Sequence, residues 1–475
     1  MTSTALDDPT TMDAVALAQA LQSRALSPAA VMAAVLDRIE AVNPKINAIV
    51  SLRPRAELMA EAEALDQGVP TGPLWGMPFA AKDLVATKGL RTTWGSPVFA
   101  NHVPASDDLL AARVRAAGAV LIGKTNAPEW GQGSHSFNPV FGATRNPYDL
   151  SRSAGGSSGG AAAALAARLL PLADGSDMMG SLRNPAAFCN VYGFRPTWGL
   201  VPLDAEGDTF LSTLTTDGPM ARSPRDLALL LSVLAGPNPE VPFARPSGDF
   251  TARFGSSLAG KRIGWLADWG GAYPMEPGIL STCETALGVF EDLGAVVEPL
   301  APPFPAEDLW SSWTTLRAGL NAGAKRDLAD DPAKRALTKP ETLWEIEQGA
   351  SLTAAAFYDA SVTRSRWYAC AARLFGRFDA LALPAAQVWP FPVEWRWPDQ
   401  IAGRRMDTYH RWMEVVVPVS LAGLPCLALP AGFSAAGLPT GLQLFGSAGA
   451  DAAILAMGDA YHRATDWPAR RPPAV

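Results

Sequence analysis

The sequence predicts a large α/β protein built around one buried core. The chain has 475 residues, of which 48% are hydrophobic and 18% are charged, a balance typical of a packed globular protein. A helical pattern over 107–117 lies between the apolar runs 77–81 and 119–122, which gives a β-α-β-like unit. This length could hold two or three average domains, but large α/β enzymes often bury a single core, and we expect one domain here.

Helices are expected to fill the N-terminal part of the chain. Residues 13–41 contain two helical patterns, and the second begins with Ser27 as N-cap and Pro28 in the first turn. Asn43-Pro44 should end this helix, and a third helix follows over about 54–67. The first eleven residues contain two aspartates and no basic segment before an apolar run, so they do not resemble a signal peptide.

Two serine-containing turns form the most unusual part of the sequence. Gly155-Gly156 and Gly159-Gly160 surround Ser157-Ser158, and such glycine pairs indicate backbone conformations that other residues avoid. An alanine-rich helix follows, then a short apolar strand over 169–173, and a second tight turn presents Ser181. Because the strand returns directly after a short helix, we expect the two serine turns to be neighbours in space. Upstream, the apolar strand 77–81 ends at Lys82, an unusual place for a surface lysine.

Two further patterns match known motifs by spelling only. G-A-V-L-I-G-K-T (118–125) fits the Walker A motif, but its middle residues predict a strand where phosphate binding needs a loop. G-G-S-S-G (155–159) fits the nucleophile elbow of α/β-hydrolases, yet the residues before it are polar and interrupted by Pro147. A histidine-dependent serine hydrolase stays open as an alternative, with His462 as its best candidate base.

The second half of the chain predicts further strands and helices and one tryptophan-rich loop. The expected elements are strand 192–196, helix 224–234, a surface linker at 236–259, strand 261–267, helix 277–293, strands 380–383, 426–430 and 441–445, and a helix from 451 to about 462. The strands beyond residue 380 are expected to join the main sheet. Residues 387–399 contain too many prolines for a helix or strand, so they predict a semi-rigid loop.

Composition argues against several classes of partner. The formal net charge is -7 and no cluster of five basic residues occurs, which argues against nucleic acid as the main partner. The four cysteines lie far apart, so neither a disulfide framework nor a structural zinc site is indicated; they are Cys189, Cys283, Cys370 and Cys426. No apolar run is long enough to cross a bilayer. We therefore expect a soluble, cytoplasmic protein without a membrane partner.

Three separated motifs resemble those of the amidase signature family. They are G-M-P-F-A-A-K-D (76–83), G-G-S-S-G-G-A-A-A (155–163) and G-S-D-M-M-G-S-L-R-N-P-A (175–186), in the family's order. The resemblance implies the amidase signature fold, an α/β fold in which a large twisted mixed β-sheet is covered by helices on both sides. It divides the single domain into N-terminal helices (1–70), a signature core (71–235), a variable region with lid or substrate loops (236–415) and C-terminal strands and a helix (416–475).

The family's pattern implies a catalytic role for three residues. Ser181 is the nucleophile, Ser157, which follows a cis peptide, relays its proton, and Lys82 is the base. Burial against Phe79 and Ala80, with no carboxylate nearby, should keep the lysine neutral. The resemblance also assigns supporting hydrogen bonds to Ser158, Ser176, Asp177 and Arg183.

The turn before the nucleophile departs from the family. The oxyanion hole would be formed by the backbone amides of Met178, Met179, Gly180 and Ser181. Many members have Gly-Gly-Ser where this chain has Met179-Gly180-Ser181, so whether Met179 permits the same backbone angles is open. Asp177 and Arg183 could instead form a purely structural ion pair.

The resemblance implies an amidase that cleaves the carbon-nitrogen bond of an amide through an acyl-enzyme. It implies no metal and no organic cofactor, a small-molecule amide as substrate, and a monomer or homodimer. One alternative is a subunit of the tRNA-dependent amidotransferase, which shares the fold and acts on glutamine together with partner subunits.

The tryptophan-rich loop indicates where a substrate could bind. Trp389, Phe391 and Trp395 are candidates for the substrate pocket, because long loops often cover binding sites and aromatic side chains supply apolar area. Aryl or hydrophobic amides, anilides and carbamates would then be preferred, with esters as further substrates. The alternative is that these rings only pack the loop onto the core.

Overall fold

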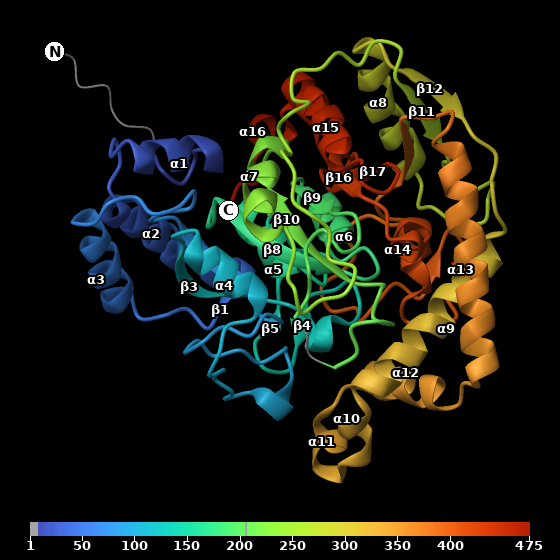
Figure 1. Ribbon diagram of the computed structural model, residues 1–475, viewed down its shortest axis with the longest axis horizontal. Helices are drawn as coiled ribbons and strands as arrows, with labels where there is room; N and C mark the ends of the chain where they lie inside the picture. Colours follow the sequence, from blue (N-terminus) through green and yellow to red (C-terminus); the bar gives the residue numbers. More distant parts are fainter. Residues whose placement is uncertain (1–7, 205–206) are drawn as a thin grey trace.

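The centre of the molecule is an eight-stranded mixed sheet (Figure 1). A computed structural model describes residues 8–204 and 207–475. Most of the N-terminal stretch that was compared with a signal peptide, residues 1–7, lies outside the described residues. β11 is parallel to β12 and β13, and the other pairs are antiparallel. The spatial order is β12 (Val296–Pro299), β11 (Arg262–Trp265), β13 (Ala380–Pro384), β17 (Pro439–Phe445), β16 (Cys426–Phe433), β9 (Tyr192–Arg195), β10 (Thr216–Ala221) and β8 (Leu172–Asp177).

Helices cover both faces of this sheet, and the α/β fold expected from the sequence is confirmed. Side chains alternate along each strand, so Leu381 and Leu383 enter one hydrophobic core while Ala380 and Ala382 enter the other. The first core includes α5 (Gly159–Ala166), α6 (Arg183–Phe188) and α14 (Val417–Ala422). The second includes α7 (Pro224–Leu234), α8 (Ile279–Asp292) and α15 (Asp451–Thr465).

A smaller sheet carries the lysine of the candidate site. β2 (Pro78–Lys82) pairs in parallel with β3 (Val120–Thr125), which also pairs with β1 (Ile49–Val50), and α4 (Leu109–Ala116) connects β2 to β3. Since β3 runs through to Thr125, the Walker-like stretch is a strand, as expected, and not a phosphate-binding loop. The backbone N–H of Lys82 donates a 2.9 Å hydrogen bond to Asp174 Oδ1 on β8, which joins the two sheets.

The N-terminal helices form as expected, with one correction. They are α1 (Ala14–Gln22), α2 (Pro28–Ile46) and α3 (Arg55–Asp66), and Ser27 caps α2 by accepting from the N–H of Ala30. The prediction that Asn43-Pro44 ends α2 is wrong, because the helix continues to Ile46. Pro44 lies in the last turn, and Asn47 ends the helix in a left-handed conformation with its N–H donated to Asn43 O at 2.7 Å.

The strand expected over 169–173 is displaced toward the C-terminus. β8 begins only at Leu172 because residues 167–171 complete the end of α5, where Arg168 has a φ of 60° and Leu169 N–H donates to Ala164 O. The strand then extends to Asp177, so it leads directly into the turn that presents Ser181. Two strands of the main sheet, β10 and β12, were not expected from the sequence.

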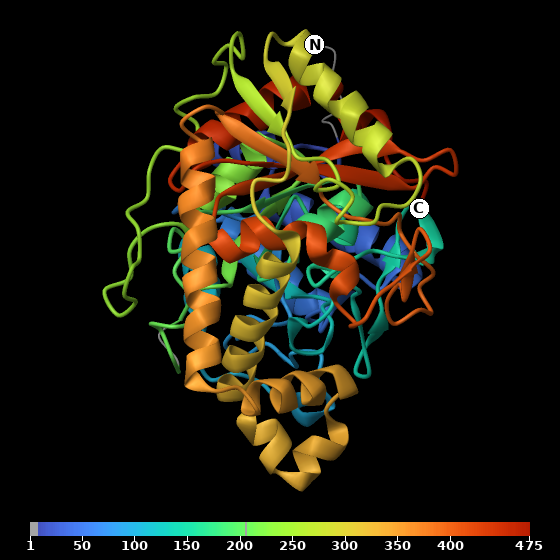
Figure 2. The same cartoon turned by 90° about the vertical axis from the view of Figure 1, so that its right-hand side faces the viewer.

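A helical lobe occupies much of the variable region. α9 (Ala306–Ala324), α12 (Pro340–Ala350) and α13 (Ala354–Leu374) pack together, and α10 (Arg326–Asp330) and α11 (Pro332–Leu337) project at the tip (Figures 1 and 2). Residues 387–399 contain no helix or strand, which confirms the expected loop. In the described chain no helix combines the length and apolarity needed to cross a bilayer.

Short elements complete the fold. They are η1 (Pro97–Phe99), η2 (Glu129–Gly131), β4 (Phe137–Asn138), β5 (Gly142–Ala143), β6 (Arg145–Asn146), β7 (Asp149–Ser153), β14 (Gln400–Ile401), β15 (Arg404–Arg405), η3 (Arg411–Val416) and α16 (Trp467–Arg470).

Candidate active site

Lys82 lies at the end of β2 and points into a group of serine hydroxyls. Its side chain is buried, and Nζ lies 2.8 Å from Ser157 Oγ, 2.9 Å from Ser158 Oγ and 2.9 Å from Ser176 Oγ. Ser157 and Ser158 come from one turn, whereas Ser176 lies on β8. The structure therefore gathers three of the residues singled out in the sequence around the amino group of a fourth, Lys82.

Burial lowers the pKa of Lys82 to about 8, which favours the neutral amine. The expectation that no carboxylate lies nearby is wrong, because Asp174 and Asp217 both act on this amine and raise its pKa against the effect of burial. The Asp83 carboxylate, next to Lys82 in the chain, accepts hydrogen bonds from the hydroxyl and N–H of Thr93.

The Ser157 turn is held by hydrogen bonds to its carbonyl groups. The Gly156–Ser157 peptide is cis, Ser134 Oγ donates to Gly156 O at 2.7 Å, and Ser136 Oγ donates to Ser157 O at 3.3 Å. β6 and β7 precede this turn as a separate two-stranded ribbon, so Ser157 does not follow a core strand as a nucleophile-elbow serine does.

Asp177 shapes the turn that presents Ser181. Its carboxylate accepts the N–H groups of Gly180 at 2.9 Å and Leu182 at 3.2 Å. Ser158 N–H donates to Ser181 O at 3.1 Å, so the two serine turns are neighbours, as expected. None of the hydrogen bonds within residues 8–204 and 207–475 joins the hydroxyls of Ser157 and Ser181, and that contact is open in this conformation.

A buried ion-pair network holds Asp177 in turn. Arg183 Nη2 and Nε donate to the two carboxylate oxygens at 2.8 and 2.9 Å, and Arg195 Nη1 lies 3.2 Å from Oδ1. Burial alone would raise the pKa of Asp177, but Arg183 and Arg195 hold it below its ordinary value. The Asp177–Arg183 ion pair, one of the two alternatives left open by the sequence, is therefore present as part of a triad, and its third member, Arg195, was not anticipated.

The backbone of the turn before Ser181 accommodates the side chain of Met179. Gly180 has a φ of 76°, whereas Met179 does not occur among the described residues with positive φ, so a side chain is tolerated there. Gly180 N–H is already donated to Asp177, but no hydrogen-bond acceptor is recorded in the described chain for the N–H groups of Met178, Met179 and Ser181. Three of the four N–H groups expected to form an oxyanion hole therefore have no acceptor among the described residues.

The helical lobe contacts this turn through Met178. Arg317 on α9 donates from Nη1 to Met178 Sδ at 3.1 Å and from Nη2 to Tyr409 OH at 2.9 Å. Glu345 on α12 accepts from Arg317 Nε at 2.6 Å and from Gln132 Nε2 at 3.2 Å. Nothing local in the sequence links these residues, because their partners lie tens to hundreds of positions away.

The three aromatic pocket candidates lie apart from one another. Phe391 is buried and its ring packs against His135, Phe188 and Trp412. Trp389 Nε1 donates to Pro277 O, and Trp395 is 49% exposed. Their contact with a substrate stays a prediction.

The histidines are engaged elsewhere. His462 Nδ1 lies 3.2 Å from Tyr192 OH and its Nε2 lies 3.9 Å from Asp466, while His135 lies against Ser153 and Val393 O. Among the described residues no histidine is hydrogen-bonded to Ser157 or Ser181, and no group of three His, Cys, Asp or Glu side chains is arranged to bind a metal ion.

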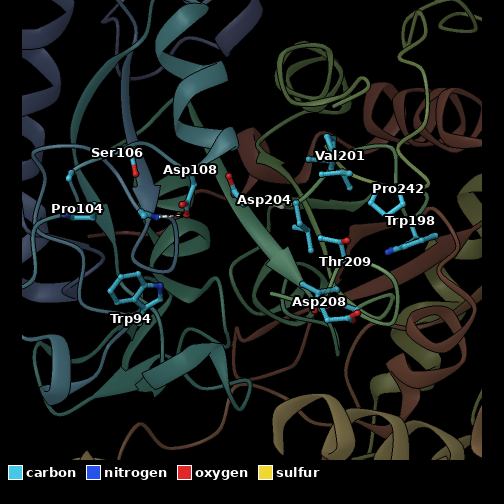
Figure 3. A pocket seen from close by; sticks show the side chains of 18 of the residues that line it. Trp94, Pro104, Ser106, Asp108, Trp198, Val201, Asp204, Asp208, Thr209 and Pro242 are labelled. Atoms are coloured by element: carbon cyan, nitrogen blue, oxygen red, sulfur yellow. Dashed lines mark hydrogen bonds between the residues drawn. The ribbon is translucent and has the colours of Figure 1, made fainter. Parts of the chain in front are cut away.

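A cavity of about 500 Å³ is lined mainly by residues from segment 94–108, which precedes α4, and from segment 198–215, which precedes β10. Trp94 and Trp198 lie on opposite sides of it, with Asp204 between them (Figure 3). Lys82, Ser157 and Ser181 do not line this cavity.

Comparisons with known proteins identify the family. The model of the family described as Amidase matches residues 30–455. This chain belongs to the amidase signature family. A glutamyl-tRNA(Gln) amidotransferase subunit of Chloroflexus aurantiacus is 37% identical to this amidase signature protein, covering 93% of this chain and 94% of that one. An acylamidase of Rhodococcus erythropolis is 33% identical and covers 97% of each chain.

A solved structure agrees with this assignment. A bacterial aryl acylamidase of the amidase signature family superposes with a TM-score of 0.89 at 30% identity, covering 97% of this chain and 99% of that one. This family member is therefore an amide-hydrolysing enzyme.

Proposed function

We propose that the enzyme cleaves amides through an acyl-enzyme on Ser181, with Ser157 and Lys82 as its proton relay. The observation that carries this proposal is the position of the buried Lys82 amine, 2.8 Å from Ser157 Oγ. A pKa near 8 leaves a usable fraction of the amine neutral at ordinary pH, and only the neutral amine can accept a proton.

The reaction follows from these positions. Ser181 Oγ attacks the amide carbonyl while its proton passes to Ser157, and the Ser157 proton passes to Lys82 Nζ. The N–H groups of Met178, Met179 and Ser181 would receive the developing oxyanion. The relay then returns a proton to the leaving nitrogen, the C–N bond breaks, and water releases the acyl group by the same path.

The side chains that border the serine turns favour an apolar substrate. A Cβ atom on Gly131 would lie 2.7 Å from Leu84 and 3.5 Å from Ser157 Oγ, so the Leu84 side chain lies next to the relay. The methyl groups of Val416 lie 3.0 Å from the corresponding point on Gly180. Together with the partly exposed Met178 they surround the turn with hydrocarbon and a thioether, which suits aryl or hydrophobic amides, anilides and carbamates, with esters as further substrates.

The charge nearest this surface is not free to bind a polar substrate. Arg317, which contacts Met178, is paired with Glu345 at 2.6 Å. A substrate would have to break this buried pair to use the guanidinium, at a cost of several kcal/mol. We therefore expect glutamine to be a poorer substrate than aryl amides. Separately, we infer a cytoplasmic enzyme that acts as a monomer or homodimer without a cofactor.

An amidotransferase-type subunit is the second candidate, because the relative from Chloroflexus aurantiacus is such a subunit. The two functions differ in substrate and in partners. Strict dependence on glutamine, or copurification of a second subunit, would favour the amidotransferase.

The catalytic assignment is tested by a labelling experiment and three variants. A serine-directed phosphonate should add to the wild-type protein at Ser181, and intact mass with peptide mapping locates the adduct. Ser181→Ala should abolish turnover, and Ser157→Ala and Lys82→Ala should each lower kcat by orders of magnitude while KM changes little. If Lys82→Ala kept more than about a tenth of the activity, the lysine mechanism would be wrong.

The substrate assignment is tested by ratios of kcat/KM. An aryl amide, an anilide and an aryl carbamate are compared with acetamide and glutamine under the same conditions. We expect the aromatic substrates to be preferred by at least tenfold, and a preference for the small polar amides would contradict the proposal. The same panel applied to Trp389→Ala, Phe391→Ala and Trp395→Ala decides whether the tryptophan-rich loop takes part.

A further inference from the structure

We propose that Asp174, assisted by Asp217, is the counter-charge that allows Lys82 to hold a proton during amide cleavage. Both carboxylates act through Lys82, so they are positioning residues and do not touch the substrate. The inference rests on the proposed role of Lys82 as the base.

Asp174 occupies a buried position between the two sheets. Its side chain is 1% exposed, and Oδ1 accepts the backbone N–H of Lys82 at 2.9 Å. The other oxygen, Oδ2, is buried and has no hydrogen-bond partner among the described residues. A buried carboxylate oxygen without a donor is costly, so its presence beside the relay needs a compensating charge.

Asp217 lies on the same side of the sheet. It is paired with Ser176 across the antiparallel strands β10 and β8, and directly opposed residues direct their side chains to one face. Asp174 precedes Ser176 by two positions on β8 and therefore shares that face. Since Ser176 Oγ lies 2.9 Å from Lys82 Nζ, both carboxylates are on the side of the amine.

The proposed proton relay requires a negative charge near Lys82. Lys82 must be neutral before Ser181 attacks and positively charged until the leaving nitrogen takes its proton. Burial alone favours only the neutral form, and the hydroxyls of Ser157, Ser158 and Ser176 carry no net charge. A carboxylate that opposes burial keeps the base strong enough for the proton transfer.

Burial and the nearby charges act on the pKa values of these two carboxyl groups in opposite directions. Burial raises the pKa of Asp217 to about 7, an effect strengthened by Asp174 and opposed by Lys82. Burial also raises the pKa of Asp174, and the Lys82 N–H together with the charges of Lys124 and Lys82 acts in the opposite direction.

The other charged groups around this cluster are Asp177, Asp83, Asp108 and Asp204. Asp177 also acts on Lys82 but is paired with Arg183 and Arg195. The charge of Asp83 raises the pKa of Lys124. Asp108 and Asp204 line the large cavity and raise the pKa of Asp217.

The decisive variant is Asp174→Asn. The amide oxygen of asparagine can still accept the Lys82 N–H, so the variant removes the charge while keeping the hydrogen bond and the shape. Loss of the negative charge should move the acid limb of the kcat/KM profile about one pH unit lower, and the plateau at high pH should fall several-fold because the base is weaker. Asp217→Asn should shift the limb in the same direction.

Asp226→Asn is a matched control. Asp226 on α7 is also buried, its Oδ1 accepts the Val15 N–H at 2.9 Å, and its Oδ2 has no partner among the described residues. Its interactions are with residues 13–15, Arg222 and Ser223 and not with the relay, so Asp226→Asn should keep the wild-type pH profile. A merely structural role of Asp174 would lower the rate without moving the limb.

The outcomes separate this inference from the proposed function. If Lys82→Ala is inactive but Asp174→Asn and Asp217→Asn both keep the wild-type limb, the counter-charge idea is overturned and the lysine mechanism stands. An equal shift in Asp226→Asn would overturn it as well. If Lys82→Ala stays active, the proposed function itself fails. Should Asp174→Asn not fold, the partly buried Asp217 decides the question alone.

Discussion

Replacing Lys82 by methionine should abolish activity and make the stability of the protein less dependent on pH. The lysine has a pKa of about 8 in the folded chain, against 10.5 for an exposed lysine side chain. The folded state therefore binds fewer protons than the unfolded state between these values. It follows that stability rises with pH across this window, and that the lysine costs stability below it.

The magnitude follows from the size of the shift. The pKa of Lys82 is lower by 2.5 (10.5 − 8) in the folded chain, which corresponds to about 3 kcal/mol of stability lost at pH 7 and below. At pH 10 most of this cost has disappeared. The free energy of unfolding of Lys82→Met relative to wild type should therefore fall by about 2.5 kcal/mol between pH 7 and pH 10. The hydrogen bonds that methionine cannot make to the three serines change the absolute difference but not its dependence on pH.

Denaturant unfolding at the two pH values measures this difference, with amide hydrolysis assayed on the same samples. Lys261→Met, at an exposed site paired with Asp379, supplies the baseline for removing a lysine. If the free energy of unfolding of Lys82→Met differed from that of wild type by the same amount at both pH values, the reasoning would be refuted. Such a result would mean that burial does not favour the neutral amine.

Three further outcomes follow from the site. Asp177→Asn leaves Arg183 and Arg195 with an uncharged partner in a buried site, so it should lower the free energy of unfolding by about 3–5 kcal/mol in denaturant titrations and kcat by at least tenfold. Met178→Ala removes the thioether that contacts Arg317, and steady-state kinetics should show KM for aryl amides raised several-fold with kcat less affected. His462→Gln should leave kcat/KM within about twofold of wild type, because His462 contacts Tyr192 and not the serine turns; a collapse in a folded variant would revive a histidine mechanism.

The sequence was informative where the residues of the candidate site belong to short motifs of consecutive residues. The glycines around Ser157 and the turn at Ser181 could be recognised from their spelling, and the strand that ends at Lys82 from its apolar run. These local signals led to the lysine and serines that the structure places together. The same applies to β13, β16 and β17, which are short apolar runs and join the main sheet as expected.

Features that depend on distant contacts were not predictable in the same way. β10 contains Gly218 and Pro219, which are poor strand residues, and is held in place by pairing with β8 over its whole length. Asp174 is separated from Lys82 by 92 positions and Glu345 from Gln132 by 213. No pattern within a segment reports such a contact, so the two carboxylates near Lys82 and the lobe's attachment at Met178 emerge only from the folded chain.

The attachment of the helical lobe suggests a practical route to altered selectivity. The lobe contacts the turn that carries Ser181 at the side chain of Met178, whereas the hydrogen bonds that shape the turn come from Asp177 on β8. Libraries that vary α9 and α12 would therefore change the surroundings of Met178 while the hydrogen bonds within the turn stay in place. Segments exchanged between related enzymes at residues 306 and 374 would make the corresponding chimaeras, with the buried Glu345 as the one position to keep fixed.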